Sequence, residues 1–519
     1  MRDATPVLLG LDLGTRECRA VLVTPEGRIL HVARRTTPTR RTRDGGAIHP
    51  PAALVAAAEA VIAECAAAGA VTSAWAAGVG GAGGSAGVAG SARPRIAAIG
   101  IAGMAEAGVA LDERDRPVGE LLAWHDPRPA AAAREIAAEI GPERLFAITG
   151  TRPQAKHPLA RLRRLAREEP AAARRVRRWA GVPELVGLAL TGRLGTNASL
   201  AARTQLFDVR NGRWDPELVA LADIADLRPD GLPVVLPFGR PIGGLRAGPA
   251  RRLGMRAGIP VVVAGHDHVV AGIAAGATRP GRVLDSMGSA EMALLVTRRP
   301  ALDDGVRRAG FSTGTHALDG LAYVAGGLQA SGALIDWFVD GFLGGGAPGD
   351  PYGPLLRLLA AAPAGPTGLV VRPYLRGRTG PAPDPSASLD ITGLREQHGA
   401  GAVAQALLES TAFHVRWMLE ELARLAGTPI HEVRVVGGGT RNRAWLRVKA
   451  AVSPWPLRAV TLDEAVAVGA AIAAGAGVGI EVAGTGDRAP LDRVPVGRGM
   501  RRRYDTAYRE AFLPAVGDG

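Results

Sequence analysis

The chain has 519 residues, which is too many for one ordinary hydrophobic core and predicts two large domains. Its formal charge is +13, but aromatic residues make up only 4% and the arginines are scattered. A nucleic-acid-binding protein usually gathers its basic residues into patches with interleaved aromatics, so we expect no nucleic-acid partner. Two cysteines cannot form a disulfide framework, which favours a reducing, cytoplasmic setting.

No stretch is predicted to direct the chain to a membrane. The N-terminus has acidic residues around a very short apolar run, unlike a signal peptide. The apolar stretch from Ala465 to Ile480 is shorter than the ~20 residues that span a bilayer, and it is better interpreted as a buried helix. The densest basic run, Arg161 to Arg178, has leucines at helical spacing and is interpreted as the solvated face of a helix.

The chain opens with three predicted strands, Val7 to Leu11, Arg19 to Val23 and Arg28 to Val32, and an Ala-rich helix follows from Pro51 to Ala68. The turn after the first strand carries the polar residues Asp12, Thr15 and Arg16 together with Gly14. This turn is the first candidate for a ligand-binding loop.

Residues 78–90 form a low-complexity Gly/Ala stretch, which predicts a flexible insertion. The stretch contains Gly78-x-Gly80-x-x-Gly83, the spacing of a dinucleotide fingerprint. No clear strand precedes it and no amphipathic helix follows, so the spacing carries little weight. A Walker pattern is absent from the whole sequence.

A predicted strand from Arg95 to Ile101, continued by Val109 to Leu111, leads to the cluster Ala123-Trp124-His125-Asp126-Pro127-Arg128. This cluster joins an aromatic ring, an acid and a base at a strand end. Asp126 also suits a helix N-cap with Pro127 at the first helical position, and both interpretations can hold together. Residues 130–225 look mainly helical, and we place the domain boundary near Ala250.

The stretch Pro260 to Val270 reads PVVVAGHDHVV and predicts a buried strand followed by a helix. Ligands of open α/β sheets bind beyond the carboxyl ends of strands, where Asp267 would stand. A general base is useful at this point, but an aspartate there also caps a helix. The local sequence leaves both interpretations open.

The second half repeats the pattern. Predicted strands from Gly281 to Asp285 and from Ala290 to Thr297 flank a small turn with Gly288 and Ser289. A strand from Glu432 to Val436 precedes three glycines, and a helix is predicted from about Asn442. A plain turn needs one glycine, so a run of three favours close approach of a ligand to the backbone.

In this order, the motifs resemble those of the FGGY carbohydrate kinases. The motifs are Leu11-Asp12-Leu13-Gly14-Thr15, Trp124-His125-Asp126-x-Arg128, Gly265-His266-Asp267, Asp285-Ser286-Met287-Gly288-Ser289-Ala290-Glu291, Val436-Gly437-Gly438-Gly439 and Val468-Gly469-Ala470-Ala471. The resemblance implies an α/β protein of two ribonuclease-H-like (actin-like ATPase) domains with an interdomain cleft. Residues 1–250 would then be mainly sugar-binding and residues 251–519 mainly ATP-binding.

The resemblance also implies roles. Asp267 would be the general base in an ATP-dependent phosphorylation of a hydroxyl of a small sugar or polyol. Asp12 and Asp267 would help to hold Mg²⁺. The ATP-binding residues would be Asp12, Gly14, Thr15, Arg16, Gly288, Ser289, Gly438, Gly439 and Asn442. The family's usual lysine and threonine are replaced by Arg19 and Ser289, and neither change removes a group that the chemistry needs.

The implied substrate-binding residues are Glu106, Trp124, Asp126, Asp267 and His268. A carboxylate pair, Glu106 and Asp126, suits a neutral polyol or sugar and disfavours an acid such as gluconate. His266 and His268 flank the expected base and either touch the sugar or only pack.

Two other functions compete with an active kinase. The first is a catalytically degenerate sugar- or nucleotide-binding member of the same fold, because fold does not determine function. The presence of Asp12, Asp267 and Gly288 argues against it. The second is a dinucleotide-dependent oxidoreductase, which rests on the glycine spacing at 78–83 alone. A homodimer is left open.

Overall fold

The computed structural model describes residues 6–71, 95–346, 350–362, 364–489 and 491–517. Its contacts divide the chain into two compact units. Unit 1 comprises Met1–Gly276, Gly314–Leu321 and Asp463–Arg488, and unit 2 comprises Ala277–Thr313, Ala322–Leu462 and Ala489–Gly519. The predicted insertion at 78–90, with its glycine spacing, lies outside the described residues.

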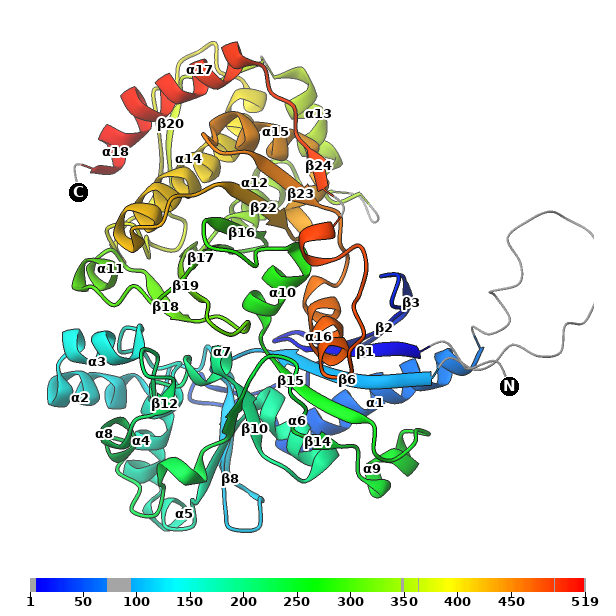
Figure 1. Cartoon of the computed structure of the whole chain (residues 1–519). Helices are drawn as coiled ribbons and strands as arrows, with labels where there is room; N and C mark the ends of the chain where they lie inside the picture. The colour runs from blue at the N-terminus through cyan, green and yellow to red at the C-terminus, as the bar shows by residue number, and fades with distance from the viewer. Residues whose placement is uncertain (1–5, 72–94, 347–349, 363, 490, 518–519) are drawn as a thin grey trace, which may run out of the picture. The chain divides into compact units, whose positions relative to one another are not determined.

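Unit 1 is built on a six-stranded sheet with the order β14-β15-β6-β1-β2-β3 (Figure 1). Its strands are β1 (Pro6–Leu13), β2 (Glu17–Val23), β3 (Ile29–Thr36), β6 (Arg95–Gly103), β14 (Gly243–Gly244) and β15 (Pro260–His266). The strands β1, β6 and β15 run parallel, so their carboxyl ends lie at one edge of the sheet. The pairing of β15 with β6 keeps residues 260–266 in unit 1, whereas the sequence predicted a division at residue 250.

Helices cover both faces of this sheet. The helix α1 (Pro51–Val71) contacts β1, β2 and β3, and α6 (Val182–Thr191) contacts β6 and β15. The helix α16 (Ala465–Ala476) contacts β1 and β6 and packs beside α10 (Asp267–Ala275). Two glycines permit the approach of α16, since a Cβ on Gly10 or Gly100 would lie within 2 Å of a carbonyl oxygen of that helix, at 1.9 and 1.8 Å. The stretch predicted as a buried helix is therefore confirmed, and it returns to unit 1 from late in the chain.

One helix of unit 1 resembles a membrane span by its composition. Residues Pro51–Ala68 of α1 are long and apolar enough to cross a membrane on length and hydropathy alone. Leu54, Val61 and Ile62 of this helix belong to the core cluster that contains Leu9 and Leu11 of β1. Packing on the sheet thus accounts for part of the apolarity of α1, since 28% of Pro51–Ala68 is buried.

The remainder of unit 1 is a second sheet with helices beside it. This sheet has the order β4-β5-β8-β7-β9, with strands β4 (Arg40–Arg41), β5 (Ala47–Ile48), β7 (Gly108–Leu111), β8 (Pro117–Leu122) and β9 (Arg178–Gly181). The stretch 109–111 thus belongs to another sheet and does not continue β6. The helices are α2 (Ala130–Ile140), α3 (Pro142–Thr149), α4 (Pro158–Glu168), α5 (Pro170–Ala173), α7 (Ala198–Ala201), α8 (Pro216–Ala220) and α9 (Ala247–Arg252). Short strand pairs are formed by β10 (Gly195–Asn197) with β13 (Val234–Leu236), and by β11 (Phe207–Asp208) with β12 (Arg213–Trp214).

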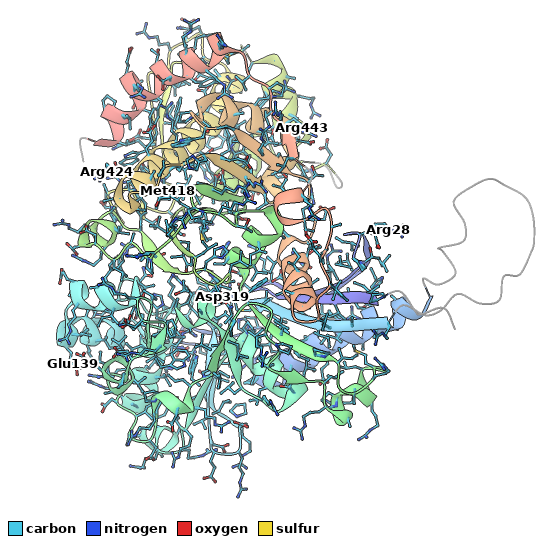
Figure 2. All side chains as sticks on the ribbon, in the orientation of Figure 1. Arg28, Glu139, Asp319, Met418, Arg424 and Arg443 are labelled. Carbon is cyan, nitrogen blue, oxygen red and sulfur yellow. The ribbon has the colours of Figure 1, made fainter. Side chains whose placement is uncertain are left out.

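The basic run in α4 is not simply a solvated face. Arg163 is buried and donates to the backbone oxygen of Leu221 at 2.7 Å and to Glu139 at 2.6 Å. Glu139, labelled in Figure 2, lies on α2. Arg161 is also buried and donates to the backbone oxygens of Leu122 and Ala123. These arginines were expected at the surface because helical spacing of leucines does not reveal which carbonyls lie beneath the same helix.

Unit 2 repeats the design of unit 1. Its sheet has the order β18-β19-β17-β16-β22-β23-β24. The strands are β16 (Arg282–Met287), β17 (Glu291–Thr297), β18 (Ser312–Thr315), β19 (Ala322–Leu328), β22 (Glu432–Val436), β23 (Leu457–Val460) and β24 (Leu491–Arg493). In both sheets three antiparallel strands, β3-β2-β1 and β19-β17-β16, are followed by two parallel strands and an antiparallel edge strand, and β18 extends the second sheet beyond β19. The strands β16 and β22 therefore correspond to β1 and β6.

Helices and a small hairpin complete unit 2. The helices are α11 (Asp304–Arg308), α12 (Gly332–Phe342), α13 (Gly353–Ala361), α14 (Ala400–Ala426), α15 (Arg443–Val452), α17 (Arg498–Ala507) and α18 (Leu513–Gly517), and the hairpin pairs β20 (Val370–Pro373) with β21 (Leu389–Thr392). The long helix α14 contacts β17, β19 and α15.

Candidate active site

The turn between β1 and β2 presents the first group of predicted residues. Asp12 is 8% exposed and its carboxylate has no hydrogen-bond partner among the described residues. Its pKa is raised to about 7, because burial and the neighbouring Asp267 carboxylate both disfavour its charged form. Gly14 closes the turn by donating to the backbone oxygen of Glu17 at 3.1 Å, and Arg16 is exposed. A buried acid without a partner is a position where a cation would be favourable.

Asp267 is the first residue of α10 and follows the carboxyl end of β15. Its Oδ1 accepts from the backbone N–H of His268 at 2.6 Å and lies 3.0 Å from Nε2 of His266. Its Oδ2 has no partner in the described part of the chain. Burial raises the pKa of Asp267, but His268, His266 and the two hydrogen bonds lower it more, so the net shift is downward. One oxygen is thus held in place while the other remains available on an ionised carboxylate.

Glu106 follows β6, next to β15, and is 8% exposed. Its Oε1 accepts from Nη2 and Nε of Arg203 at 2.6 and 3.1 Å, and Nζ of Lys156 lies 3.5 Å away. Burial alone would raise its pKa, but Arg203 and then Lys156 hold the pKa well below its usual range. Glu106 in turn raises the pKa of His268, so the two groups interact electrostatically.

Trp124 and Asp126 lie in the loop after β8, and the structure separates their roles. The Trp124 ring is 40% exposed, and its Nε1 donates to Oγ1 of Thr15 at 2.8 Å, which joins this loop to the turn after β1. Both oxygens of Asp126 are used internally, by Arg128 at 2.8–3.1 Å and by the backbone N–H of Ala47 at 2.9 Å. The side chain of Asp126 is fully buried against its Arg128 partner.

Two sequence interpretations of this region need correction. Asp126 does not cap a helix, because α2 begins only at Ala130 with Pro129 as its N-cap. The predicted pair of free carboxylates is also not present, because Asp126 is compensated by Arg128 and Glu106 by Arg203. Since each carboxylate is paired with an arginine, the two carboxylates do not by themselves disfavour an acidic substrate.

In unit 2, the hairpin between β16 and β17 carries Gly288 and Ser289, both exposed. The loop is anchored through its backbone, since the oxygens of Gly288 and Ser289 accept from Gly332, Ser331 and Ala333 at the start of α12, each at 3.0 Å. Beneath the loop, the ammonium of Lys449 is bonded to both Asp285 and Glu291, all three nearly fully buried. Glu291 also accepts from the Ser331 hydroxyl at 2.6 Å. The loop with the Ser289 hydroxyl thus lies above a buried cluster of ion pairs.

The three glycines after β22 serve different purposes. Gly437 has φ +98° and a Cβ there would lie 2.5 Å from the Met287 backbone oxygen, while a Cβ on Gly439 would lie 2.9 Å from the Met287 side chain. Gly438 has neither constraint: its φ is outside the left-handed region and nothing lies within 4 Å of a Cβ built on it. Asn442 caps α15, with its Oδ1 accepting from the Trp445 N–H at 3.1 Å. Local packing explains the first and third glycines but not Gly438.

Comparison with known proteins agrees with this architecture. The N-terminal domain of the FGGY family of carbohydrate kinases matches residues 7–274, and the C-terminal domain of the same family matches residues 284–478. The chain belongs to the FGGY family of carbohydrate kinases. A glycerol kinase of Gloeobacter violaceus is 30% identical over 517 residues, covering 98% of this chain and 94% of that protein. A gluconokinase of Bacillus subtilis is 23% identical over 68% of each chain. The crystal structure of xylulose kinase from Rhodospirillum rubrum covers 99% of each chain with a TM-score of 0.85 and 28% identity.

Family membership confirms the predicted α/β fold class and the prediction of a kinase that phosphorylates an alcohol group of a carbohydrate. Each of the three relatives named above is called a kinase, and none supports a non-catalytic binding module or an oxidoreductase. The individual residue roles in this FGGY kinase stay predictions. The structure brings Asp12, Asp267 and Trp124 with Thr15 into one region of unit 1, and it places Gly288, Ser289 and the glycine run in unit 2.

Sequence reasoning missed the cations of this carbohydrate kinase. Arg203 and Lys156 lie 97 and 50 positions from their partner Glu106, and Lys449 lies far from the acids that it joins. One signal was available: of 62 Lys and Arg residues, only Lys156 and Lys449 are lysine. Both lysines contact buried carboxylates next to predicted functional motifs. A residue type that a chain otherwise avoids marks positions where its particular chemistry is needed.

Proposed function

We propose that this protein transfers the γ-phosphoryl group of ATP to a hydroxyl of a small sugar or polyol, with Asp267 as the general base. The observation that carries the proposal is the state of the Asp267 carboxylate. It follows a central parallel strand, its Oδ1 is held by His268 and His266, and its Oδ2 has no partner among the described residues. In a member of this family, that free oxygen is suited to accept the proton of the attacking hydroxyl.

The protonation state of Asp267 fits this role. A base must be ionised at the working pH, and the net lowering of its pKa keeps Asp267 ionised at neutral pH. The hydrogen bond from the His268 N–H fixes the rotation of the carboxylate, so that the proton moves to a defined atom, Oδ2. Oδ2 would take the proton as the substrate oxygen attacks phosphorus. Phosphoryl transfer depends mainly on positioning and charge stabilisation, and the fixed carboxylate contributes to the positioning.

Asp12 is proposed to help hold Mg²⁺ together with Asp267. Within the described residues no group of three or more His, Cys, Asp or Glu side chains is placed to hold a metal ion. The two carboxylates of Asp12 and Asp267 fit Mg²⁺, which retains several waters and is held by one or two carboxylates plus substrate phosphates. Mg²⁺, when bound with ATP, would supply compensation for phosphate charge. A cation there would also offset the burial and the Asp267 repulsion that together raise the pKa of Asp12 to about 7.

The proposed nucleotide-binding residues are the small loops of both units. In unit 1 these are Gly14, Thr15 and Arg16, where Trp124 fixes the Thr15 hydroxyl. In unit 2 they are Gly288, Ser289, Gly438, Gly439 and Asn442. The open space over Gly438 is the supporting feature, since a glycine that neither conformation nor packing requires leaves room for a flat ring or a phosphate.

On the acceptor side we propose Glu106, Trp124 and His268 as substrate-binding residues. Oε1 of Glu106 is used by Arg203, while Oε2 has no protein donor among the described residues and suits a substrate hydroxyl. Burial lowers the pKa of His268, so its ring is neutral at pH 7 and able to donate or accept one hydrogen bond. Asp126, with both oxygens engaged, is proposed to shape the loop that presents Trp124.

The test is a coupled ADP-release assay with a panel of polyols, sugars and sugar acids, since relatives are named as kinases of glycerol, xylulose and gluconate. ADP release that requires both an acceptor and Mg²⁺, and a phosphorylated product identified by mass spectrometry, are the expected results. Release of ADP at the same rate with and without every acceptor would contradict the proposal. A cytoplasmic location and a homodimer belong to the same proposal and are checked by fractionation and light scattering.

A further inference from the structure

Lys156 has hydrogen-bonding capacity that the protein does not use. Its ammonium carries three donors, and within the described residues its single contact is the long one of 3.5 Å to Oε1 of Glu106. That oxygen is already occupied by two shorter bonds from Arg203. The Lys156 side chain is 30% exposed, so its head group is neither buried in a closed network nor free in solvent.

The charges around this ammonium do not balance. Glu106 provides one negative charge, while Arg203 and Lys156 provide two positive charges within 3.5 Å of the same oxygen. Arg152 adds a further positive charge close enough to act on Lys156, and His157 is held neutral by burial. Among the charged groups that act most on Lys156, one carboxylate, Glu106, thus stands against two guanidinium groups, those of Arg203 and Arg152. The region around Glu106 therefore carries an excess of positive charge.

The use of lysine at this position is specific in this chain. Arginine serves nearly everywhere else, including the second cation on Glu106. Arginine presents a planar fork that is largely saturated by one carboxylate, whereas lysine presents a compact point charge on a flexible stem. An ammonium beside an already satisfied carboxylate is suited to a second, external acceptor. Leaving it uncompensated when a neutral ligand excludes water would be costly.

We propose that Lys156 binds an anionic group of the acceptor, so that this kinase prefers a sugar acid over the neutral polyol of the same carbon chain. The inference rests on the proposed function, because it assigns Lys156 to the acceptor side of that reaction. The anionic group would replace water on the ammonium, while Oε2 of Glu106 accepts a hydroxyl of the same molecule. Such a substrate cancels the excess charge, which a polyol does not.

The test compares matched acceptors that differ in one group: gluconate with glucitol, xylonate with xylitol, and glycerate with glycerol. We expect the wild-type enzyme to show at least a tenfold higher kcat/KM for the acid in one or more pairs. In Lys156→Met this preference should fall ten- to hundredfold, the effect of removing a hydrogen bond between charged groups, mainly through KM for the acid. Because Lys156 also contacts Glu106, the readout is the ratio of kcat/KM for the acid to kcat/KM for the polyol, and use of the acid should fall more than use of the polyol.

Lys156→Arg is the matched control, since it keeps the charge and should retain most of the preference for acids. A thermal melt of both variants confirms folding, and calorimetric titration with gluconate in the absence of ATP gives a readout independent of turnover. Equal or better use of the polyol by the wild type, or a preference that Lys156→Met leaves within twofold, contradicts this inference while leaving the proposed function intact. Failure of every acceptor to yield an ATP-dependent product contradicts the proposed function instead.

Discussion

Replacing Asp267 by asparagine separates a catalytic carboxylate from one that only stabilises a helix. In Asp267→Asn the amide oxygen can keep the 2.6 Å bond from the His268 N–H, so the local backbone is retained. The atom that takes the place of Oδ2 is an N–H₂ group, which cannot accept a proton. The substitution thus preserves shape and hydrogen bonding while removing the proposed proton acceptor.

The expected effects on stability and on catalysis differ in size. Asp267 is the first residue of α10, and loss of a negative charge at a helix N-terminus costs about 0.3–1 kcal/mol. Loss of a general base lowers kcat by about 10²–10⁴-fold, which corresponds to roughly 2.7–5.5 kcal/mol of transition-state stabilisation. We therefore expect a melting temperature within a few degrees of the wild type, together with a kcat reduced by at least a factor of 100.

The assay is initial-rate ADP release at saturating ATP and acceptor, with nucleotide binding measured separately by calorimetry. The matched control is Asp304→Asn, because Asp304 is likewise the first residue of a helix, α11, and lies outside the proposed active site. This control should keep its kcat. Near-normal kcat in folded Asp267→Asn would refute the assignment of Asp267 as the base and would leave the helix interpretation standing.

Three further predictions follow from the geometry of single residues. Gly438→Ala should leave the melting temperature unchanged and raise KM for ATP at least fivefold, whereas Gly437→Ala should lower the melting temperature, since its Cβ would clash with Met287 and its φ is +98°. If Gly438→Ala binds ATP normally, the nucleotide does not lie there. Asp126→Asn should destabilise the fold without a large change in acceptor KM, because both oxygens are held inside the protein; a KM raised tenfold in a stable variant would return Asp126 to the acceptor-binding residues. Burial raises the folded-state pKa of Glu184 to about 7, above the ordinary 4.5, so stability from this group is lost as pH rises from 4.5 to 7. Glu184→Gln should then stabilise the protein by up to about 3 kcal/mol at pH 8 and less at pH 5, and equal gains in denaturant melts at both pH values would contradict this.

Local patterns predicted the strands and the main helices of both units well. Alternating or continuous apolar runs bounded by Gly and Pro placed β1, β2, β15, β16 and β22 within a few residues. Such runs are recognisable in the sequence because the apolar residues of a buried strand are consecutive or alternate along the chain. The assignment of strands to sheets was less accurate, since 109–111 joins β8 and β9 and not β6. Pairing is decided by partners distant in the sequence, which no local pattern contains.

For the candidate site, too, the positions of residues along the chain were predictable and their tertiary partners were not. Asp12, Asp267 and Gly438, which lie at or just beyond strand ends, were predicted as site residues because parallel strands present their carboxyl ends at one edge. The state of each side chain was not predicted. Glu106 was expected to be free and is paired with Arg203, and Asp126 was expected to face the substrate and is enclosed by Arg128. Position relative to a strand is a local property, whereas the charge that a side chain meets is a tertiary one.

The duplicated topology shows why charge state decides between two similar motifs. Both units place an aspartate near the end of the first central strand, Asp12 in β1 and Asp285 in β16, before a short glycine-containing turn. In unit 2, Lys449 of α15 binds Asp285 and Glu291, so this acid belongs to a closed ionic cluster beneath its loop. In unit 1 the cation that acts most on Asp12 is Arg19, and Arg19 is bonded to Glu17 and Glu464. An aspartate near the end of the first central strand is thus part of a buried ion cluster where a lysine reaches it, as at Asp285, and lacks such a partner at Asp12, the residue proposed to help hold Mg²⁺. A single long-range partner, and not the motif itself, distinguishes the two aspartates.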